Sequence, residues 1–374
     1  MESPNNNHLG IVLPAGGARA AYQVGVLKYI AHHYKSFNPT ILSGVSAGSI
    51  NSTFLAQGDP PEKALDRLYE LWSQLQFSSV LSTNFESLFK MGMRWTYDMF
   101  LSKVTQKLLL RSLLDASPLA ATLTQNIHFW KISRALRQGT IRGVAITATN
   151  YHNGLTTIFF DSAHPLPGWA REGRVAVRNP IRPRHIMASC SIPILFEPVR
   201  VGDYLYGDGS LRFNFPFSPA IRLGAKHLIA VSIRCPNPLN VIGIRPEHIG
   251  MGFIAGTVLN SIFLDSIETD YENLLRINRI SGGSEQNKLN AILIQPSQDL
   301  GYIAKDFLND VPYHLRQLLK STANPEELGD LLSYLMFSPG YLKLLLELGF
   351  KDAETQKPRL DAFFAAVDHT VFVT

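Results

Sequence analysis

Cysteine is scarce in this chain: its 374 residues contain only Cys190 and Cys235. Two such cysteines supply neither a zinc-ligand spacing nor a disulfide framework, so the folded state must be stabilised by its apolar core. Cys190 lies beside a predicted helix that precedes Pro193. We expect it to be a small core residue rather than a reactive thiol.

Long apolar runs are also missing. No stretch reaches the roughly 18 consecutive apolar residues that a membrane-spanning helix needs, so any membrane contact is expected to be peripheral. Residues 1–8 are polar, and no basic segment precedes an apolar one there. We therefore expect no signal peptide and predict a cytoplasmic protein.

Charge is sparse and only mildly biased. Charged residues make up 17% of the chain and the formal net charge is +5. The basic residues are scattered and no motif of a nucleic-acid reader occurs, so we expect no nucleic-acid partner. Hydrophobic residues make up 45%, which is ordinary for a globular protein and argues against disorder.

The N-terminal part contains two successive strand, turn and helix patterns. Apolar runs are broken by glycine or serine turns, after which apolar residues recur at helical spacing. Two such units predict a mainly parallel, layered α/β sheet. The first unit comprises residues 9–13, 14–17 and 18–34, and the second comprises residues 40–45, Ser46 and 47–56.

The rest of the chain is consistent with this class. We predict a three-layer α/β/α fold with a mainly parallel central sheet over residues 1–298 and a mainly helical C-terminal extension over residues 299–374. Further strands are expected at 142–149, 156–161, 227–234 and 290–295, a long helix at 251–278, and two helices within 325–348 that are broken at Ser338-Pro339-Gly340.

Ser46 lies in the pattern Gly44-Val45-Ser46-Ala47-Gly48, at a predicted strand-to-helix turn. This context is typical of a nucleophile elbow, in which glycines permit a sharp turn and the next helix directs N–H groups toward a developing oxyanion. The bare pattern occurs by chance in roughly one chain of this length in ten. Its place at a turn makes Ser46 a candidate nucleophile.

The turn Gly16-Gly17-Ala18-Arg19 follows the first predicted strand and opens a helix, where unpaired N–H groups can bind an oxyanion. A purely structural strand-to-helix turn is the alternative. Dinucleotide and phosphate loops are excluded, because neither G-x-G-x-x-G nor Gly-Lys-Ser/Thr occurs here. Arg19 could contact an anionic intermediate or a lipid phosphate, or it could form a surface ion pair.

Asp208 opens the turn Asp208-Gly209-Ser210 after a short apolar run. Loops use Asp-Gly turns freely, so a role in catalysis requires the fold to carry Asp208 back to Ser46. The sequence separation alone leaves both readings open.

Together these segments resemble the patatin-like phospholipase family over about residues 9–230. Four blocks in the expected order are far more specific than any one of them. The blocks are Gly16-Gly17-Ala18-Arg19; Gly44-Val45-Ser46-Ala47-Gly48; Ala188-Ser189-Cys190-Ser191-Ile192-Pro193 with Phe196 and Pro198; and Tyr206-Gly207-Asp208-Gly209-Ser210 with Asn214, Pro216 and Leu223-Gly224-Ala225.

The resemblance implies a Ser-Asp dyad, with Ser46 as the nucleophile and Asp208 as its partner. It also implies that the backbone of Gly16, Gly17 and Ala18 forms the oxyanion hole, and it implies no metal and no organic cofactor.

The chain departs from the family pattern at three positions. Ala15 and Ala20 stand where the family usually has glycine, and Ser210 stands where it has glycine or alanine. Ala20 is easily accommodated in a helix, whereas Ala15 would matter if the oxyanion turn required a positive φ there.

A dyad needs an aspartate whose pKa suits a serine hydroxyl, and a free aspartate with a pKa of about 3.9 is a poor match. Burial would raise that pKa, and a preorganised oxyanion hole would stabilise the developing charge. A triad is the alternative, but no histidine after Asp208 lies in a turn that singles it out. These histidines are His227, His248, His314 and His369.

We therefore predict a lipid acyl hydrolase of the phospholipase A or lysophospholipase type, acting on phospholipid or lysophospholipid through an acyl-Ser46 intermediate. A lipid-binding pseudoenzyme and a carboxylesterase for small soluble esters are the alternatives. The scissile position, the headgroup and the oligomeric state stay open.

Residues 85–114 form a basic amphipathic pattern, with large apolar residues at spacings of three and four. A helix of this kind can lie in the headgroup layer of a membrane. The same pattern also describes a helix packed over the core or roofing an acyl pocket.

Overall fold

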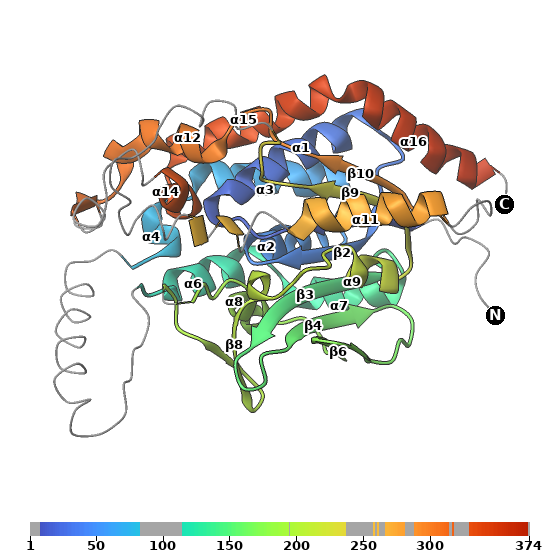
Figure 1. Cartoon of the computed structure of the whole chain (residues 1–374), viewed down its shortest axis with the longest axis horizontal. Helices are drawn as coiled ribbons and strands as arrows, with labels where there is room; N and C mark the ends of the chain where they lie inside the picture. Colours follow the sequence, from blue (N-terminus) through green and yellow to red (C-terminus); the bar gives the residue numbers. More distant parts are fainter. Residues whose placement is uncertain are drawn as a thin grey trace.

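The computed structural model describes residues 8–82, 114–193, 195–236, 257–258, 260–261, 266–280, 288–313, 316–317 and 329–372 (Figure 1). The predicted amphipathic segment 85–114 lies outside these residues apart from Leu114. Among the helices described in these ranges, none is long and apolar enough to cross a membrane.

Within the described residues, ten strands form one sheet in the order β10-β9-β1-β2-β3-β4-β6-β5, with β8 also paired to β3 and β7 to β8. Strands β10, β9, β1, β2 and β3 are mutually parallel, and the antiparallel pairs lie beyond them. The strands are β1 (His8–Leu13), β2 (Pro39–Val45), β3 (Gly143–Asn150), β4 (Thr156–Ser162), β5 (Trp169–Arg171), β6 (Arg174–Arg178), β7 (Val199–Val201), β8 (Tyr204–Asp208), β9 (Ala225–Val231) and β10 (Asn290–Ile294).

Helices cover both faces of this sheet, with α9 and α11 in front and α1 and α3 behind in the view of Figure 1. The predicted three-layer fold with a mainly parallel sheet is therefore confirmed. The helices are η1 (Gly17–Ala20), α1 (Ala21–His33), α2 (Ala47–Leu55), α3 (Pro61–Gln74), α4 (Phe77–Val80), α6 (Ser117–Asn126), α7 (Phe129–Gln138), α8 (Pro183–Ser189), η2 (Gly209–Leu211), α9 (Ser218–Arg222), α11 (Ser266–Ile280), α12 (Leu300–Ala304), η5 (Lys305–Asp310), α14 (Gly329–Leu335), α15 (Pro339–Thr355) and α16 (Lys357–Phe372).

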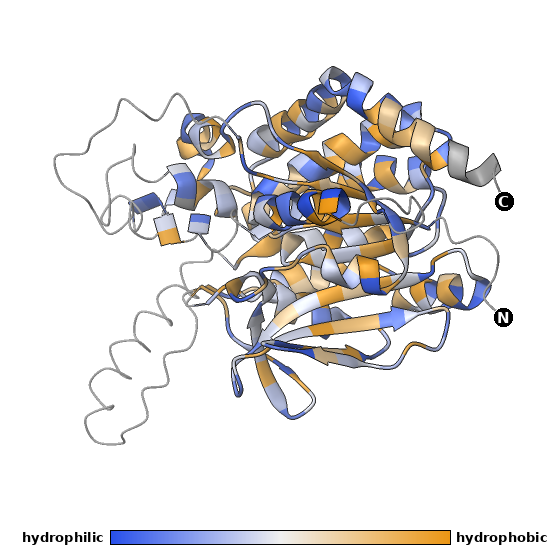
Figure 2. Cartoon of the chain, turned by 45° about the vertical axis from the view of Figure 1, so that its right-hand side comes forward, coloured by the Kyte–Doolittle hydropathy of each residue, from blue (hydrophilic) through white to orange (hydrophobic). Residues whose placement is uncertain are grey.

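The central strands are apolar along nearly their whole length, as expected for parallel strands that helices cover on both faces. Strand β1 buries five of its six residues, and β9 buries six of its seven. Figure 2 shows hydrophobic colouring along the strands, whereas the outer helices alternate between hydrophobic and hydrophilic positions. The sequence pattern therefore separates core from surface.

The predicted elements differ from the structure mainly at their ends. The predicted helix 18–34 divides into a 3₁₀ turn, η1, and the helix α1, and the predicted strand 227–234 begins and ends earlier, as β9. Of the predicted helix 251–278, the structure describes α11 and four residues before it. The predicted break at Ser338-Pro339-Gly340 separates α14 from α15, because Pro339 can only begin a helix.

The C-terminal helices pack directly on the N-terminal part of the chain, chiefly through α15 on α1. Two glycines let the helices approach closely. A Cβ on Gly25 would lie 2.0 Å from the carbonyl oxygen of Leu346, and a Cβ on Gly349 would lie 2.2 Å from that of Tyr22. The predicted boundary between a domain ending at residue 298 and a helical extension beginning at residue 299 stays a proposal. The contact between α1 and α15 joins the two parts.

We predict that Gly349→Val lowers the free energy of unfolding by about 3 kcal/mol, because the added side chain overlaps the backbone of α1. Ala365→Val, at an exposed position of α16, is the matched control and should cost less than about 1 kcal/mol through helix propensity. Urea denaturation measures both values. Equal effects at the two positions would contradict close packing of α15 on α1.

Candidate active site

Ser46 and Asp208 are brought together by the edge of β3. Strand β2 pairs with this edge as far as Val45, which lies opposite Thr147. Strand β8 then takes over the same edge, with Asp208 opposite Ala148, the next residue along β3. Strand β4 occupies the other edge of β3. The end of one strand and the end of another therefore meet, although 162 positions separate them in sequence.

Ser46 has φ +51° and ψ −130°, and no other non-glycine residue in the described ranges has a positive φ. Such a conformation is strained and typical of functional sites. The two glycines of the motif make the turn possible. A Cβ on Gly44 would lie 2.4 Å from the carbonyl oxygen of Gly48, and a Cβ on Gly48 would lie 2.3 Å from that of Leu13. The predicted elbow geometry is present at Ser46.

Two serines of the segment 188–193 hold the elbow and the aspartate in place. The hydroxyl of Ser189 accepts a hydrogen bond from the backbone N–H of Ser46 at 2.8 Å and donates one to the carbonyl of Thr147 at 2.6 Å. The carbonyl of Ser191 accepts from the backbone N–H of Asp208 at 2.8 Å. Both serines belong to a block of the family resemblance, but their roles could not be predicted, because their partners lie on other strands.

Asp208 is fully buried. Its Oδ1 accepts hydrogen bonds from the backbone N–H and the hydroxyl of Ser210, at 2.9 and 2.7 Å. Its Oδ2 is buried and has no hydrogen-bond partner among the described residues. Burial raises the pKa of Asp208 from 3.8 to about 6, opposed by the bonds from Ser210 and by the nearby hydroxyl of Ser46. Ser46 is thus close enough to lower the pKa of Asp208, although its hydroxyl and the carboxylate do not meet the geometry of a hydrogen bond.

The described histidines form no hydrogen bond with Ser46 or Asp208. His227 lies near the start of β9 and bonds Asn290, whereas Ser46 follows the end of the parallel strand β2, so the two lie at opposite ends of these strands. His248, His314 and the side chain of His369 are not among the parts of the chain that the structure describes. In the described ranges, no group of three metal-binding side chains occurs either.

The glycine turn lies beside Ser46. Gly17 has φ +53°, and a Cβ there would lie 2.2 Å from the carbonyl oxygen of Tyr334. Ala15 has no positive φ, so alanine is accommodated where the family usually has glycine. Gly17 and Ala18 open η1, and the first N–H groups of a helix have no partner within it. Gly17 and Ser46 line the same pocket.

Arg19 is buried and is held by α14 rather than lying at the surface. Its Nε donates to the hydroxyl of Ser333 at 2.7 Å, and its Nη2 donates to Asp330 Oδ1 at 3.0 Å. Its guanidinium also lies over the ring of Tyr334, 4.2 Å from the centroid. Of the alternatives for Arg19, the geometry favours an ion pair, in which the Arg19 side chain is buried and the Asp330 side chain is partly exposed. Its partners follow it by more than 300 residues, so no local sequence pattern could indicate them.

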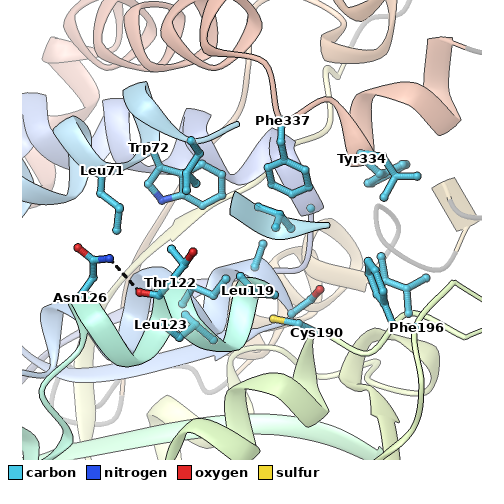
Figure 3. Close-up of a pocket in the computed structure, with 18 of the residues that line it drawn as sticks. Leu71, Trp72, Leu119, Thr122, Leu123, Asn126, Cys190, Phe196, Tyr334 and Phe337 are labelled. Atoms are coloured by element: carbon cyan, nitrogen blue, oxygen red, sulfur yellow. Dashed lines mark hydrogen bonds between the residues drawn. The ribbon is translucent and has the colours of Figure 1, made fainter. Parts of the chain in front are cut away.

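An apolar pocket opens at Ser46. It has an empty volume of about 710 Å³, part of which is open to solvent. Leu71 and Trp72 of α3 lie on one side, opposite Leu119 and Leu123 of α6 (Figure 3). The lining residues are Gly17, Ser46, Ala47, Ile50, Leu71, Trp72, Leu75, Val80, Leu119, Thr122, Leu123, Asn126, Ile127, Cys190, Ile192, Phe196, Tyr334, Leu335 and Phe337.

Several polar atoms beside this pocket are already paired within the protein. The indole N–H of Trp72 donates to Asn51 at 2.8 Å, and the amide of Asn126 donates to the carbonyl of Thr122 at 2.8 Å. The thiol of Cys190 is buried, which raises its pKa and argues against a reactive thiolate. The wall next to Ser46 is therefore suited to an apolar chain.

A search of solved structures finds similarity to VipD from Legionella pneumophila. The sequence identity is 12%, the match covers 93% of this chain and 66% of that chain, and the TM-score is 0.39. For human GIVD cytosolic phospholipase A2 in complex with methyl gamma-linolenyl fluorophosphonate, the sequence identity is 14%. The match covers 99% of this chain and 61% of that chain, with a TM-score of 0.48. For ExoU of Pseudomonas aeruginosa in complex with SpcU, the sequence identity is 14%. The match covers 88% of this chain and 51% of that chain, with a TM-score of 0.30. The chain spans less than two thirds of each.

No curated protein sequence matches the chain. The sequence model of the patatin-like phospholipases matches residues 11–221, more than half of its length. This match includes the glycine turn, the serine elbow and the Asp-Gly turn. The chain therefore belongs to the patatin-like phospholipase family.

Proposed function

We propose that the protein is a serine-dependent lipid acyl hydrolase that cleaves carboxylic esters of phospholipids or lysophospholipids with a Ser46–Asp208 dyad. The observation that carries this proposal is the meeting of a strained Ser46 and a buried Asp208, whose Oδ2 lacks a partner in the described chain, at the mouth of an apolar pocket. Family membership supports a lipid ester as the substrate.

In this mechanism Ser46 Oγ attacks the ester carbonyl while its proton passes to Asp208. The carbonyl oxygen becomes an oxyanion, which the N–H groups of the turn Gly16, Gly17 and Ala18 would stabilise. The alcohol leaves with the proton, and the acyl group stays on Ser46. Water then attacks the acyl-serine with Asp208 again as the base, and the fatty acid is released.

A pKa of about 6 makes Asp208 a better base for this step than an exposed aspartate would be. The carboxylate is ionised at neutral pH and still binds a proton more readily than a free one. Its Oδ1 is held by Ser210, which leaves Oδ2 to receive the proton. Ser210 thus orients the base, although the family usually has glycine or alanine at this position.

The pocket favours an acyl chain over a small acid, because its walls include α3, α6 and the C-terminal end of α14 and carry mainly apolar side chains. A carboxylesterase for small soluble esters would share the chemistry but would gain nothing from this pocket. A lipid-binding pseudoenzyme would use the pocket without turnover.

We predict that the protein releases fatty acid from a defined phospholipid or lysophospholipid and that Ser46→Ala abolishes this release, because no other nucleophile takes its place. A fluorophosphonate probe should label wild-type protein at Ser46 alone. Mass spectrometry of the lipid products and of the labelled peptide measures both. Labelling that persists in Ser46→Ala would place the nucleophile elsewhere.

A series of p-nitrophenyl esters from acetate to palmitate separates the alternatives. Turnover that rises with chain length supports the lipid site, and turnover highest for acetate supports a small-ester carboxylesterase. A wild-type protein that binds lipid, turns over no ester and resists the probe would be a pseudoenzyme.

We predict that kcat/KM of the wild type rises with pH through an apparent pKa near 6, because only ionised Asp208 can accept the proton. Asp208→Asn should abolish turnover at every pH. The folded chain binds the Asp208 proton more tightly than the unfolded chain does. The free energy of unfolding therefore falls as pH rises from about 4 to about 6 and stays lower above pH 6. The loss is on the order of 3 kcal/mol.

Removing this buried charge should therefore leave the Tm of Asp208→Asn at pH 8 equal to or above that of the wild type. Thermal unfolding at pH 8 is the control for folding. Near wild-type turnover in Asp208→Asn would exclude Asp208 as the base.

We predict that Ser333→Ala lowers kcat about tenfold with little change in KM, because Arg19 loses the acceptor of its Nε and the oxyanion turn is less firmly positioned. Ser333→Thr keeps a hydroxyl and should recover most of kcat. Steady-state kinetics and the rate of fluorophosphonate labelling measure the effect. A change in Tm without a change in kcat would limit Ser333 to a structural role.

A further inference from the structure

A second cleft lies away from Ser46, between the β5–β6 hairpin, α9 and the C-terminal half of α11. Its empty volume is about 1160 Å³, including space open to solvent. We call it the arginine cleft. Its walls include Arg171, Arg174, Arg222, Trp169, Phe215 and Ile277.

Two of its arginines are neighbours across the hairpin. Arg171 and Arg174 are directly paired in the antiparallel register of β5 and β6, with only Glu172 and Gly173 between them. Like charges directly opposite each other destabilise a strand pair. Burial and the nearby charges of Arg171 and Arg222 lower the pKa of Arg174. The cleft therefore concentrates positive charge in one place.

Arg174 has hydrogen-bonding capacity that the described chain does not use. Its Nε and Nη1 are buried and have no hydrogen-bond partner among the described residues. The ring of Phe215 lies over the guanidinium face, 4.2 Å from Cζ, so an acceptor must approach in the guanidinium plane. That plane is where the N–H groups of an arginine form paired bonds with a carboxylate or a phosphate.

The one carboxylate lining the cleft does not neutralise this charge. Asp270 lies close enough to influence Arg174, but no ion pair joins them in the described residues. Its Oδ2 instead accepts a hydrogen bond from the backbone N–H of Phe217 at 3.0 Å. Three guanidinium groups against one carboxylate leave an excess of positive charge in the concave surface.

The other side chains of the cleft are suited to an apolar body. Phe215 and Ile277 are 45% and 61% exposed, although both are large and hydrophobic. Trp169 is partly buried beside them. An inorganic anion would leave these side chains in water, whereas an apolar chain attached to the anion would cover them.

We propose that the arginine cleft binds an oxyanion carried on an apolar chain, such as the phosphate of a lysolipid or the carboxylate of a free fatty acid. The occupant does not reach Ser46. Arg222 precedes the start of β9 and Leu289 precedes the start of β10, whereas Ser46 follows the end of the parallel strand β2. The two sites therefore lie at opposite ends of the parallel strands.

The test measures binding of octyl phosphate, octanoate, octanol and inorganic phosphate to the full chain by isothermal titration calorimetry. Octanol carries the same chain without charge, so it reports any binding that needs no cation, including binding to the acyl pocket. The variants are Arg174→Gln and Arg222→Gln. Arg137→Gln, at an exposed position of α7, is the matched control.

Octyl phosphate or octanoate should bind at least about tenfold more weakly to Arg174→Gln and to Arg222→Gln than to the wild type, because each variant removes charge-assisted hydrogen bonds. Binding to Arg137→Gln and binding of octanol should not change. Inorganic phosphate should bind at least tenfold more weakly than octyl phosphate. Whichever amphiphile binds more tightly identifies the head group as phosphate or carboxylate.

The bound amphiphile should also raise the Tm of the wild type, and less so in the two variants. Arg222→Gln keeps the test valid if Arg174→Gln does not fold. Equal binding of octyl phosphate to wild type and variants, or octanol binding as tightly as octyl phosphate, would overturn the proposal. If inorganic phosphate bound as tightly as octyl phosphate, the proposal that the ligand carries an apolar chain would be wrong.

Discussion

The organisation of this protein depends on the edge of β3, which β2 and β8 share. A backbone edge offers one row of hydrogen-bonding groups, so β8 can begin to pair only where β2 has turned away into α2. The turn at Ser46 and the end of β8 at Asp208 therefore fall at adjacent positions of β3. The glycines around Ser46 are required because this crossing leaves no room for a Cβ.

The buried polar groups near this crossing differ in whether they have hydrogen-bond partners in the described chain. The Ser46 N–H, the Asp208 N–H and the Arg19 guanidinium are paired with Ser189, Ser191 and α14, which fixes the backbone around the site. Asp208 Oδ2 is instead buried without a partner among the described residues, and the pKa of its carboxyl group is raised. The paired groups hold the geometry rigid, and the unpaired one retains the capacity to accept a proton.

The same physical contrast distinguishes the arginine cleft from ordinary surface charge. Arg19 and Arg174 both lie against an aromatic ring, but Arg19 has a hydroxyl and a carboxylate as acceptors, whereas two nitrogens of Arg174 have none in the described chain. A guanidinium that is satisfied serves as a structural tie between α14 and the glycine turn. A guanidinium that lacks acceptors in the described chain and lies near other positive charges can bind an anionic ligand.

The sequence by itself determined the fold class, the family and the turn at Ser46, because apolar periodicity and glycine spacing are local properties of the chain. It also singled out Asp208, but only through a resemblance, since an Asp-Gly turn says nothing about what lies beside it. Only the tertiary structure decided that Ser189 and Ser191 fasten the site, that Arg19 is tied to Ser333, and that Arg171, Arg174 and Arg222 converge. These contacts join residues far apart in sequence, and their partners are fixed by strand register and helix packing, which no local pattern encodes.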